Sequence, residues 1–240
     1  LISPKVIITT IDVSFKFSEI AKILEKKINF IAIQNALVQD FLEFDYLYKA
    51  KKIKQNLNKK FYIPNLFCIG DFDRGTYQQF DINVKNFYSV GNLRLANFFY
   101  HIKSENNSPE KYNSDICLIH GSNKILEEGY VKLTKYIIKF CLKHNMKLII
   151  PLKRDKKILP GFYKLEIEYF DRSFEKEELD YIKRNILEND RDNYSSYRAL
   201  LNSKVAVSLT STLLRNKLTM GGKILACNLS KLDWYNFTVH

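Results

Sequence analysis

Long apolar runs are missing from this 240-residue chain, since no stretch approaches the roughly 20 apolar residues that a membrane-spanning helix needs. Nor does the chain open with a basic segment followed by a short apolar run, which is the pattern of a secretion signal. The first residue is leucine rather than methionine, and the last follows a strand-like segment. We therefore expect a piece cut from a longer protein, with its first and last domains incomplete.

Cysteine is also scarce. The chain has four, with no Cys-x-x-Cys pair and no histidine pair close to any of them, so their spacing argues against a zinc site. Three of them lie inside apolar runs. We expect buried free thiols and a reducing, cytoplasmic setting. The four are Cys68, Cys117, Cys141 and Cys227.

Acidic residues are outnumbered, with 26 Asp and Glu against 38 Lys and Arg, for a net charge of +12. Such a balance is typical of proteins that bind nucleic acid, anionic substrates or an anionic membrane surface. The lysines are spread along the whole chain, and the denser runs at 49–60 and 153–157 are short. This spread makes nucleic acid the least favoured of the three partners, but the net charge alone does not decide among them.

What the chain does have is an alternation of short apolar runs with amphipathic stretches. This pattern predicts an α/β fold with parallel sheets covered by helices on both faces. The clearest helices are expected at 130–144 and 174–186, and the first of these could instead be a basic helix on a membrane surface. Segment 165–170 alternates and predicts a strand nearer an edge. The other expected strands are 5–10, 30–33, 66–70, 87–90, 116–119, 148–151, 205–209 and 224–227.

A polar segment containing Pro109 separates two strand–helix series. It predicts a first domain at 1–103, a linker at 104–113 and a second domain at 114–240. Two such Rossmann-like domains would face each other across a cleft between their strand ends.

The segment 202–215 is the most informative for function. A short apolar strand is followed by Thr210, Ser211 and Thr212 and then by a helix. The start of a helix after a strand offers unpaired N–H groups and a positive dipole end, and three hydroxyls add donors for a phosphate. Ser and Thr are also ordinary helix caps, which alone would explain one or two of the three. The sequence favours a phosphorylated ligand, such as a nucleotide-linked sugar.

Polar groups follow the other predicted strands as well, where ligands bind in open α/β sheets. Each has a simpler alternative: Asp12 could cap a segment, His120 could be a turn residue, and Lys153 with Arg154 could be a solvated pair. Asp71 and Asp73 are close in sequence but lack a third metal ligand, so we expect a loop role and no metal. The strand-end candidates are Asp12, Gln34, Asn35, Asp71 and Arg94 in the first domain, and His120, Lys153 and Arg154 in the second.

Several motifs occur together in a characteristic order: Pro4-Lys-Val-Ile-Ile-Thr-Thr-Ile-Asp12, Ile31-Ala-Ile-Gln-Asn35, Gly70-Asp-Phe-Asp-Arg-Gly-Thr-Tyr77, Val90-Gly-Asn-Leu-Arg94 and Ser208-Leu-Thr-Ser-Thr-Leu-Leu-Arg215. Through them the chain resembles the bacterial surface carbohydrate biosynthesis proteins, which are glycosyltransferases of the GT-B type. The resemblance implies transfer of a sugar from a CMP-, UDP- or GDP-linked donor to a glycan or lipid-linked acceptor of lipopolysaccharide or capsule. It also implies a cytoplasmic protein with peripheral contact at the inner face of the membrane.

The resemblance also implies roles for the candidate residues. Thr210, Ser211 and Thr212 would hold the donor phosphate, with Lys153 and Arg154 offsetting its charge. Arg215 and Asn216 would lie beside the donor, and Asn216 occupies the position where such proteins commonly have a ribose-binding glutamate. Gln34, Asn35, Asp71 and Arg94 would lie on the acceptor side, with Asp12 as the base. Transfer would need no metal or other cofactor.

Two alternatives remain open from the sequence. One is transfer of a polyol phosphate from a cytidine-linked donor by a similar fold. The other is a non-catalytic basic protein that binds nucleic acid or an anionic membrane, which predicts steeply salt-dependent binding.

Overall fold

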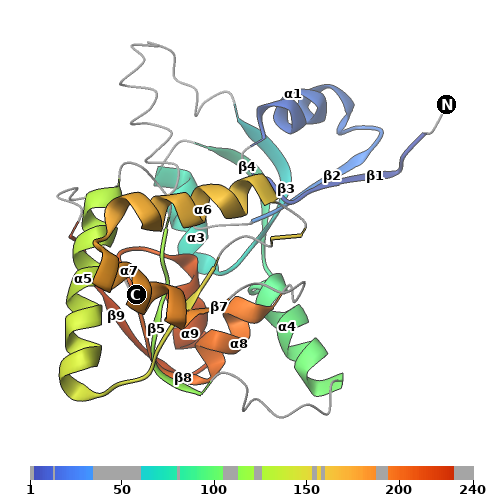
Figure 1. Ribbon diagram of the computed structural model, residues 1–240. Helices are drawn as coiled ribbons and strands as arrows, with labels where there is room; N and C mark the ends of the chain where they lie inside the picture. Colours follow the sequence, from blue (N-terminus) through green and yellow to red (C-terminus); the bar gives the residue numbers. More distant parts are fainter. Residues whose placement is uncertain are drawn as a thin grey trace. The chain divides into compact units, whose positions relative to one another are not determined.

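The computed structural model describes residues 3–12, 14–34, 61–79, 82–104, 113–121, 126–152, 156–157, 160–187 and 194–229. The chain divides into two compact units, unit 1 (Leu1–Tyr100) and unit 2 (His101–Val239). Both contain parallel strands and flanking helices, so the predicted α/β class is confirmed (Figure 1). Helix α4 (Leu93–Ser104) crosses the division, and the expected linker at 104–113 lies largely outside the described residues.

Unit 1 is built on a four-stranded parallel sheet in the order β1-β2-β3-β4. Because these strands pair in chain order, right-handed crossovers bring their connecting helices to the same face. Helices α1 and α3 accordingly pack on the face that carries Phe30, Leu66 and Phe87. The elements are β1 (Val6–Thr9), α1 (Phe15–Leu24), β2 (Asn29–Ile33), β3 (Tyr62–Cys68), α3 (Asp71–Gln79) and β4 (Asn83–Ser89).

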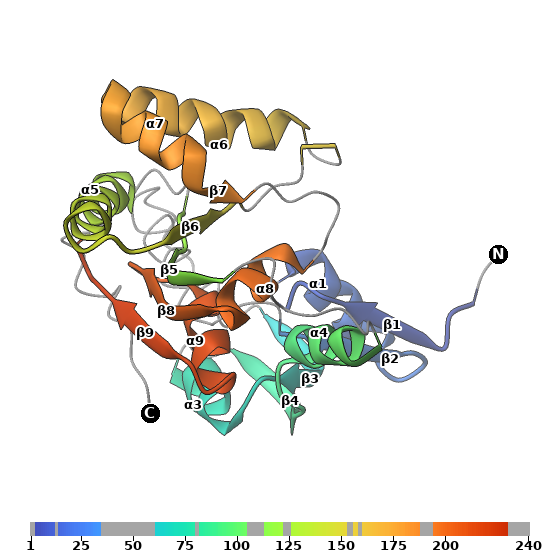
Figure 2. The same cartoon turned by 60° about the horizontal axis from the view of Figure 1, so that its bottom comes forward.

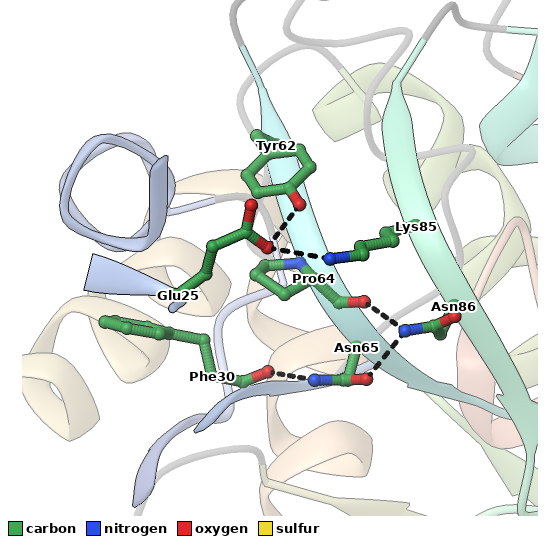
Figure 3. A network of polar contacts seen from close by, with 7 residues as sticks. All are labelled: Glu25, Phe30, Tyr62, Pro64, Asn65, Lys85 and Asn86. Carbon is green, nitrogen blue, oxygen red and sulfur yellow. Dashed lines mark hydrogen bonds and ion pairs between the residues drawn. The ribbon is translucent and has the colours of Figure 1, made fainter. Parts of the chain in front are cut away.

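Side-chain amides join the strands of unit 1 around a proline. Pro64 lies inside β3 and has no N–H to give to the ladder. The Asn86 amide donates to the Pro64 carbonyl (3.2 Å) and to Asn65 Oδ1 (3.1 Å), and the Asn65 amide donates to the Phe30 carbonyl (2.9 Å) (Figure 3). Asparagine is a poor strand former, but here these two amides link β2, β3 and β4.

Unit 2 contains five parallel strands in the order β7-β6-β5-β8-β9 (Figure 2). Helices α5, α6 and α7 cover one face, and α8 and α9 cover the other, so helices on both faces are confirmed for this unit. The elements are β5 (Ser114–Leu118), α5 (Glu127–His144), β6 (Leu148–Pro151), α6 (Pro160–Ser173), α7 (Lys176–Asn185), β7 (Ile186–Leu187), α8 (Ser195–Leu201), β8 (Ser203–Ser208), α9 (Thr212–Thr219) and β9 (Lys223–Ala226).

The two clearest predicted helices, 130–144 and 174–186, are confirmed as α5 and α7. The left-handed backbone of Asn145 (φ 50°) ends α5, a conformation that asparagine tolerates better than most residues. Three of the four free cysteines are buried, as expected, and Cys227 is half-buried. Within the described part of the chain, no helix combines the length and apolar character needed to cross a bilayer.

The expected strand at 165–170 is wrong, because these residues lie inside α6. Among the described side chains of α6, those buried are Glu166, Tyr169 and Phe170, which recur at helical spacing, whereas Leu165 is 58% exposed. Local alternation of apolar and charged residues resembles a strand, but packing of the two aromatic rings into the unit 2 core selects the helix.

Candidate functional site

The sheet of unit 2 reverses its winding between β5 and β8. From β5 the chain moves outward to β6 and β7, and it then returns to place β8 on the other side of β5. Ligands of open α/β sheets bind beyond the carboxyl ends of strands at such a reversal, because the connections there leave in opposite directions and open a crevice. We therefore take residues 119–121 and 209–212 as the candidate site, and we term it the strand-end site.

The β8–α9 turn is the part of this site where an anion was predicted to bind. Ser211 has extended backbone, and its Oγ accepts a hydrogen bond from the Leu213 N–H at 3.2 Å, so it is the cap of α9. The Leu214 N–H donates to the Ser211 carbonyl at 3.0 Å, and the helix dipole adds positive character at this end of α9. The predicted strand, hydroxyl turn and helix are confirmed. Phosphate binding by Thr210, Ser211 and Thr212 stays a prediction.

Tyr130 of α5 ties the two strand ends together. Its hydroxyl donates to the Thr210 carbonyl at 2.9 Å and lies 3.4 Å from Ser208 Oγ, which in turn donates to the Ile119 carbonyl. A Cβ on Gly121 would lie 2.8 Å from the Tyr130 ring, so only glycine fits at this close approach. The backbone after β5 and the backbone after β8 are thus held against one tyrosine.

We expect Tyr130→Phe to lower the free energy of unfolding by about 1 kcal/mol, because one hydrogen bond is lost while the ring still packs. Amide hydrogen exchange at residues 210–213 should accelerate, since the Thr210 carbonyl loses its donor. Tyr136→Phe is the matched control on the same helix, because Tyr136 is exposed. Equal exchange rates in the two variants would show that Tyr130 does not hold the turn.

Lys217 holds the C-terminal end of α9, the helix that begins at the strand-end site. Its ammonium is buried and donates to the carbonyls of Leu200 (2.5 Å) and Ser203 (2.6 Å), where α8 ends and β8 begins. A Cβ on Gly222 would collide with the Lys217 side chain. Burial lowers the pKa of Lys217. The cation therefore anchors α9 to α8 and is not available to a ligand.

His120 lies at the end of β5 but inside the core. It is 6% exposed, and its ring packs against the rings of Tyr130, Tyr169 and Phe170. Neither ring nitrogen has a hydrogen-bond partner among the described residues. Burial lowers the pKa of His120 to about 3, so the imidazole is neutral. A neutral ring among aromatic side chains offers a phosphate no positive charge, and the predicted contact gains no support from this position.

The other donor-side candidates are placed differently. Asn216 is buried, and its amide donates to the Tyr197 hydroxyl at 3.4 Å, so it faces α8. Arg215, on the same helix, is half-buried. Lys153 and Arg154 lie outside the described residues. Their roles as donor contacts stay predictions.

In unit 1, buried acidic and amide groups meet at the carboxyl ends of β1, β2 and β3. Asp12 is 7% exposed and accepts a short hydrogen bond from the Tyr77 hydroxyl. Gln34 donates to Asp73 at 2.7 Å and accepts from the Ile69 N–H at 2.8 Å. Burial and the nearby Asp12 carboxylate raise the pKa of Tyr77, so the phenol keeps its proton as donor. We term these four side chains the acidic cluster: Asp12, Gln34, Asp73 and Tyr77.

The remaining acceptor-side candidates are not part of the acidic cluster. Asp71, at the start of α3, accepts from the Ser89 hydroxyl at 2.6 Å. Arg94 is exposed in the first turn of α4, and Asn35 lies outside the described residues. The expected loop role of Asp71 and Asp73 is wrong, because both lie in α3. Sequence reasoning also missed Tyr77, which helical spacing of four places on the same face of α3 as Asp73.

The arrangement thus offers a capped helix start after β8 in unit 2 and a buried, hydrogen-bonded carboxylate in unit 1. Within the described ranges, no cluster of three or more His, Cys, Asp or Glu side chains is arranged to hold a metal ion. The chemistry that these groups can provide is binding of a negative charge and acceptance of hydrogen bonds.

A scan of protein-family models found none that matches the chain. A search of curated proteins found no significant match either.

Proposed function

We propose that the chain is a glycosyltransferase of the GT-B type, which binds the phosphate of a nucleotide-linked sugar at the strand-end site. The observation that carries the proposal is the Ser211-capped start of α9 beside β5, at the reversal of the unit 2 sheet. This position and this backbone geometry favour an anionic ligand. The α/β fold alone does not, because many unrelated functions share it.

In the proposed reaction, a hydroxyl of a surface glycan attacks the anomeric carbon while the bond to the donor phosphate breaks. The leaving nucleoside phosphate gains charge that the α9 N-terminus, Lys153 and Arg154 offset. The resemblance of the sequence motifs implies Asp12 as the base that takes the hydroxyl proton. The acceptor would be a glycan or lipid-linked glycan, so we include peripheral contact with a membrane surface in the proposal.

The decisive test is calorimetric titration of the full chain with CMP, CDP, UDP and GDP. We expect saturable binding of one nucleotide and roughly tenfold weaker binding in Ser211→Ala, because a hydroxyl contact to a charged phosphate is lost. The matched control is Ser14→Ala: Ser14 caps α1 in unit 1 and accepts from the Phe17 N–H at 3.3 Å. Both variants lose a helix cap, but only the first loses a proposed ligand contact.

Circular dichroism would verify that each variant is folded before titration. If folded wild-type protein binds none of the four nucleotides, the proposal fails. Equal weakening in Ser14→Ala and Ser211→Ala would show that loss of a cap, rather than loss of a phosphate contact, lowers the affinity.

A further inference from the structure

The outer surface of α5 combines positive charge with exposed apolar side chains. Residues 129–147 contain five lysines and neither Asp nor Glu. The inner side of the helix is buried in the unit 2 core through residues such as Leu133 and Ile137. We term the exposed group the outer α5 face: Tyr136, Lys139, Phe140, Leu142 and Lys143.

The apolar members of this face are open to solvent. Tyr136 is 64% exposed, Leu142 is 62% exposed and Phe140 is 46% exposed. Helical spacing puts positions 136, 139, 140 and 143 on one side, with Leu142 bordering them. The Phe140 ring packs on the ring of His144, 4.6 Å away, which favours an ordered position for it on this surface. Large apolar side chains grouped with lysines on one helix face indicate a binding surface more than scattered exposure does.

The charge on this helix is not neutralised evenly. Lys132 pairs with Glu128 at 2.6 Å, and Lys135 pairs with Glu178 of the neighbouring helix α7 at 3.0 Å. Lys139 and Lys143 form no ion pair with any described residue. Lys143 lies in the last turn, where a cation complements the helix dipole, but the dipole explains neither Lys139 nor the exposed rings.

We propose that the outer α5 face binds the surface of an anionic phospholipid bilayer. Lysines would meet the lipid phosphates, while Tyr136, Phe140 and Leu142 would enter the headgroup region, as amphipathic surfaces do at membrane interfaces. This inference names the surface for the membrane contact in the proposed function and rests on that function for its setting. Vesicle binding needs no nucleotide and nucleotide titration needs no lipid, so the two proposals can fail separately.

The position of this face is compatible with ligand binding in unit 2. Helix α5 connects the parallel strands β5 and β6, so it runs antiparallel to them (Figure 1). Its C-terminal half, which carries the outer α5 face, therefore lies toward the amino ends of the strands. The strand-end site is at the opposite edge of the same sheet, so bilayer and ligand would not compete for it.

The test is co-sedimentation of the full chain with vesicles of phosphatidylcholine alone or mixed with phosphatidylglycerol. We expect binding to the mixed vesicles, and roughly 25-fold weaker binding in the double variant Lys139→Gln/Lys143→Gln, about fivefold for each lysine. The matched control is Lys16→Gln/Lys164→Gln, which removes the same charge from exposed positions on α1 and α6. Failure to bind the mixed vesicles, or equal loss in the two double variants, would overturn the proposal.

A second measurement reports on the apolar side chains. The chain has one tryptophan, Trp234, outside the described residues, so Phe140→Trp in a Trp234→Phe background places a single fluorophore on the outer α5 face. We expect a blue shift on addition of mixed vesicles and quenching by brominated lipid. If sedimentation equilibrium instead shows a dimer that Phe140→Ser abolishes, a second copy of the chain occupies this face and the proposal fails.

Discussion

Tyr77→Phe is expected to lower the free energy of unfolding of unit 1 by about 2 to 3 kcal/mol, because a buried carboxylate loses a hydrogen-bond donor. Asp12 is 7% exposed, so water cannot fully replace the Tyr77 hydroxyl. Denaturant titration would measure the loss. Hydrogen exchange of the β2 and β3 amides would assign it to unit 1.

The matched control is Tyr62→Phe. Tyr62 also donates to a carboxylate, Glu25, at 2.5 Å, and Lys85 lies 3.3 Å from the same oxygen. This contact is much more open to solvent, so we expect a clearly smaller loss. A double-mutant cycle of Tyr77→Phe with Asp12→Asn should give a coupling energy of about 1 kcal/mol or more. Additive losses would show that the two side chains do not stabilise each other.

His120→Phe is expected to remove most of the acid sensitivity of unit 2. Burial lowers the pKa of His120 from 6.5 to about 3. Above pH 6.5 the ring is neutral in both the folded and unfolded states. Below that pH, His120 is protonated in the unfolded chain but stays neutral in the folded protein. The free energy of unfolding therefore falls by about 2 kcal/mol between about pH 7 and about pH 5. The contribution of His120 to stability is therefore present above its pKa in the unfolded chain, and it is lost as the pH falls toward its pKa in the folded protein.

Thermal unfolding at about pH 7 and about pH 5 would give the change of stability with pH, the slope, for the wild type and the variant. The slopes are compared because the substitution can also change absolute stability through packing. His144→Gln is the control, since His144 is exposed on α5. We expect its slope to match that of the wild type. A His120→Phe protein that keeps the wild-type slope would show that the ring is not held neutral by burial.

The elements that the sequence predicted well are those whose hydrophobic pattern fits only one type of secondary structure. The nearly continuous apolar runs of β5, β6 and β8 suit a strand buried on both faces, and the long periodic face of α5 suits a covering helix. In α6 the same local pattern fits both a strand and a helix. The choice there depends on Tyr169 and Phe170 packing into the core, which no local signal contains.

The strand-end site was predictable in outline because a strand, a hydroxyl and a helix are neighbours in sequence. Its organising side chain, Tyr130, was not predictable, since Tyr130 and Thr210 are 80 residues apart. The acidic cluster of unit 1 was missed for the same reason, since Tyr77 and Asp12 are 65 residues apart. The burial of His120 was equally hidden. A histidine before a glycine at a strand end is typical of an exposed turn. Here three aromatic rings from α5 and α6, which are distant in sequence, pack against the His120 ring and exclude water from it.

The two strand orders have different consequences while the chain is being synthesised from its N-terminus. Each strand of unit 1 pairs with the one made before it, so its sheet can grow strand by strand. In unit 2 the central strand β5 can pair with β6 on one edge, but its other edge must wait for β8, since Ser114 pairs with Ser203. Contacts between distant segments form slowly, and an unpaired strand edge is prone to aggregation. Unit 2 is therefore the part of the nascent protein for which protection by a chaperone matters most.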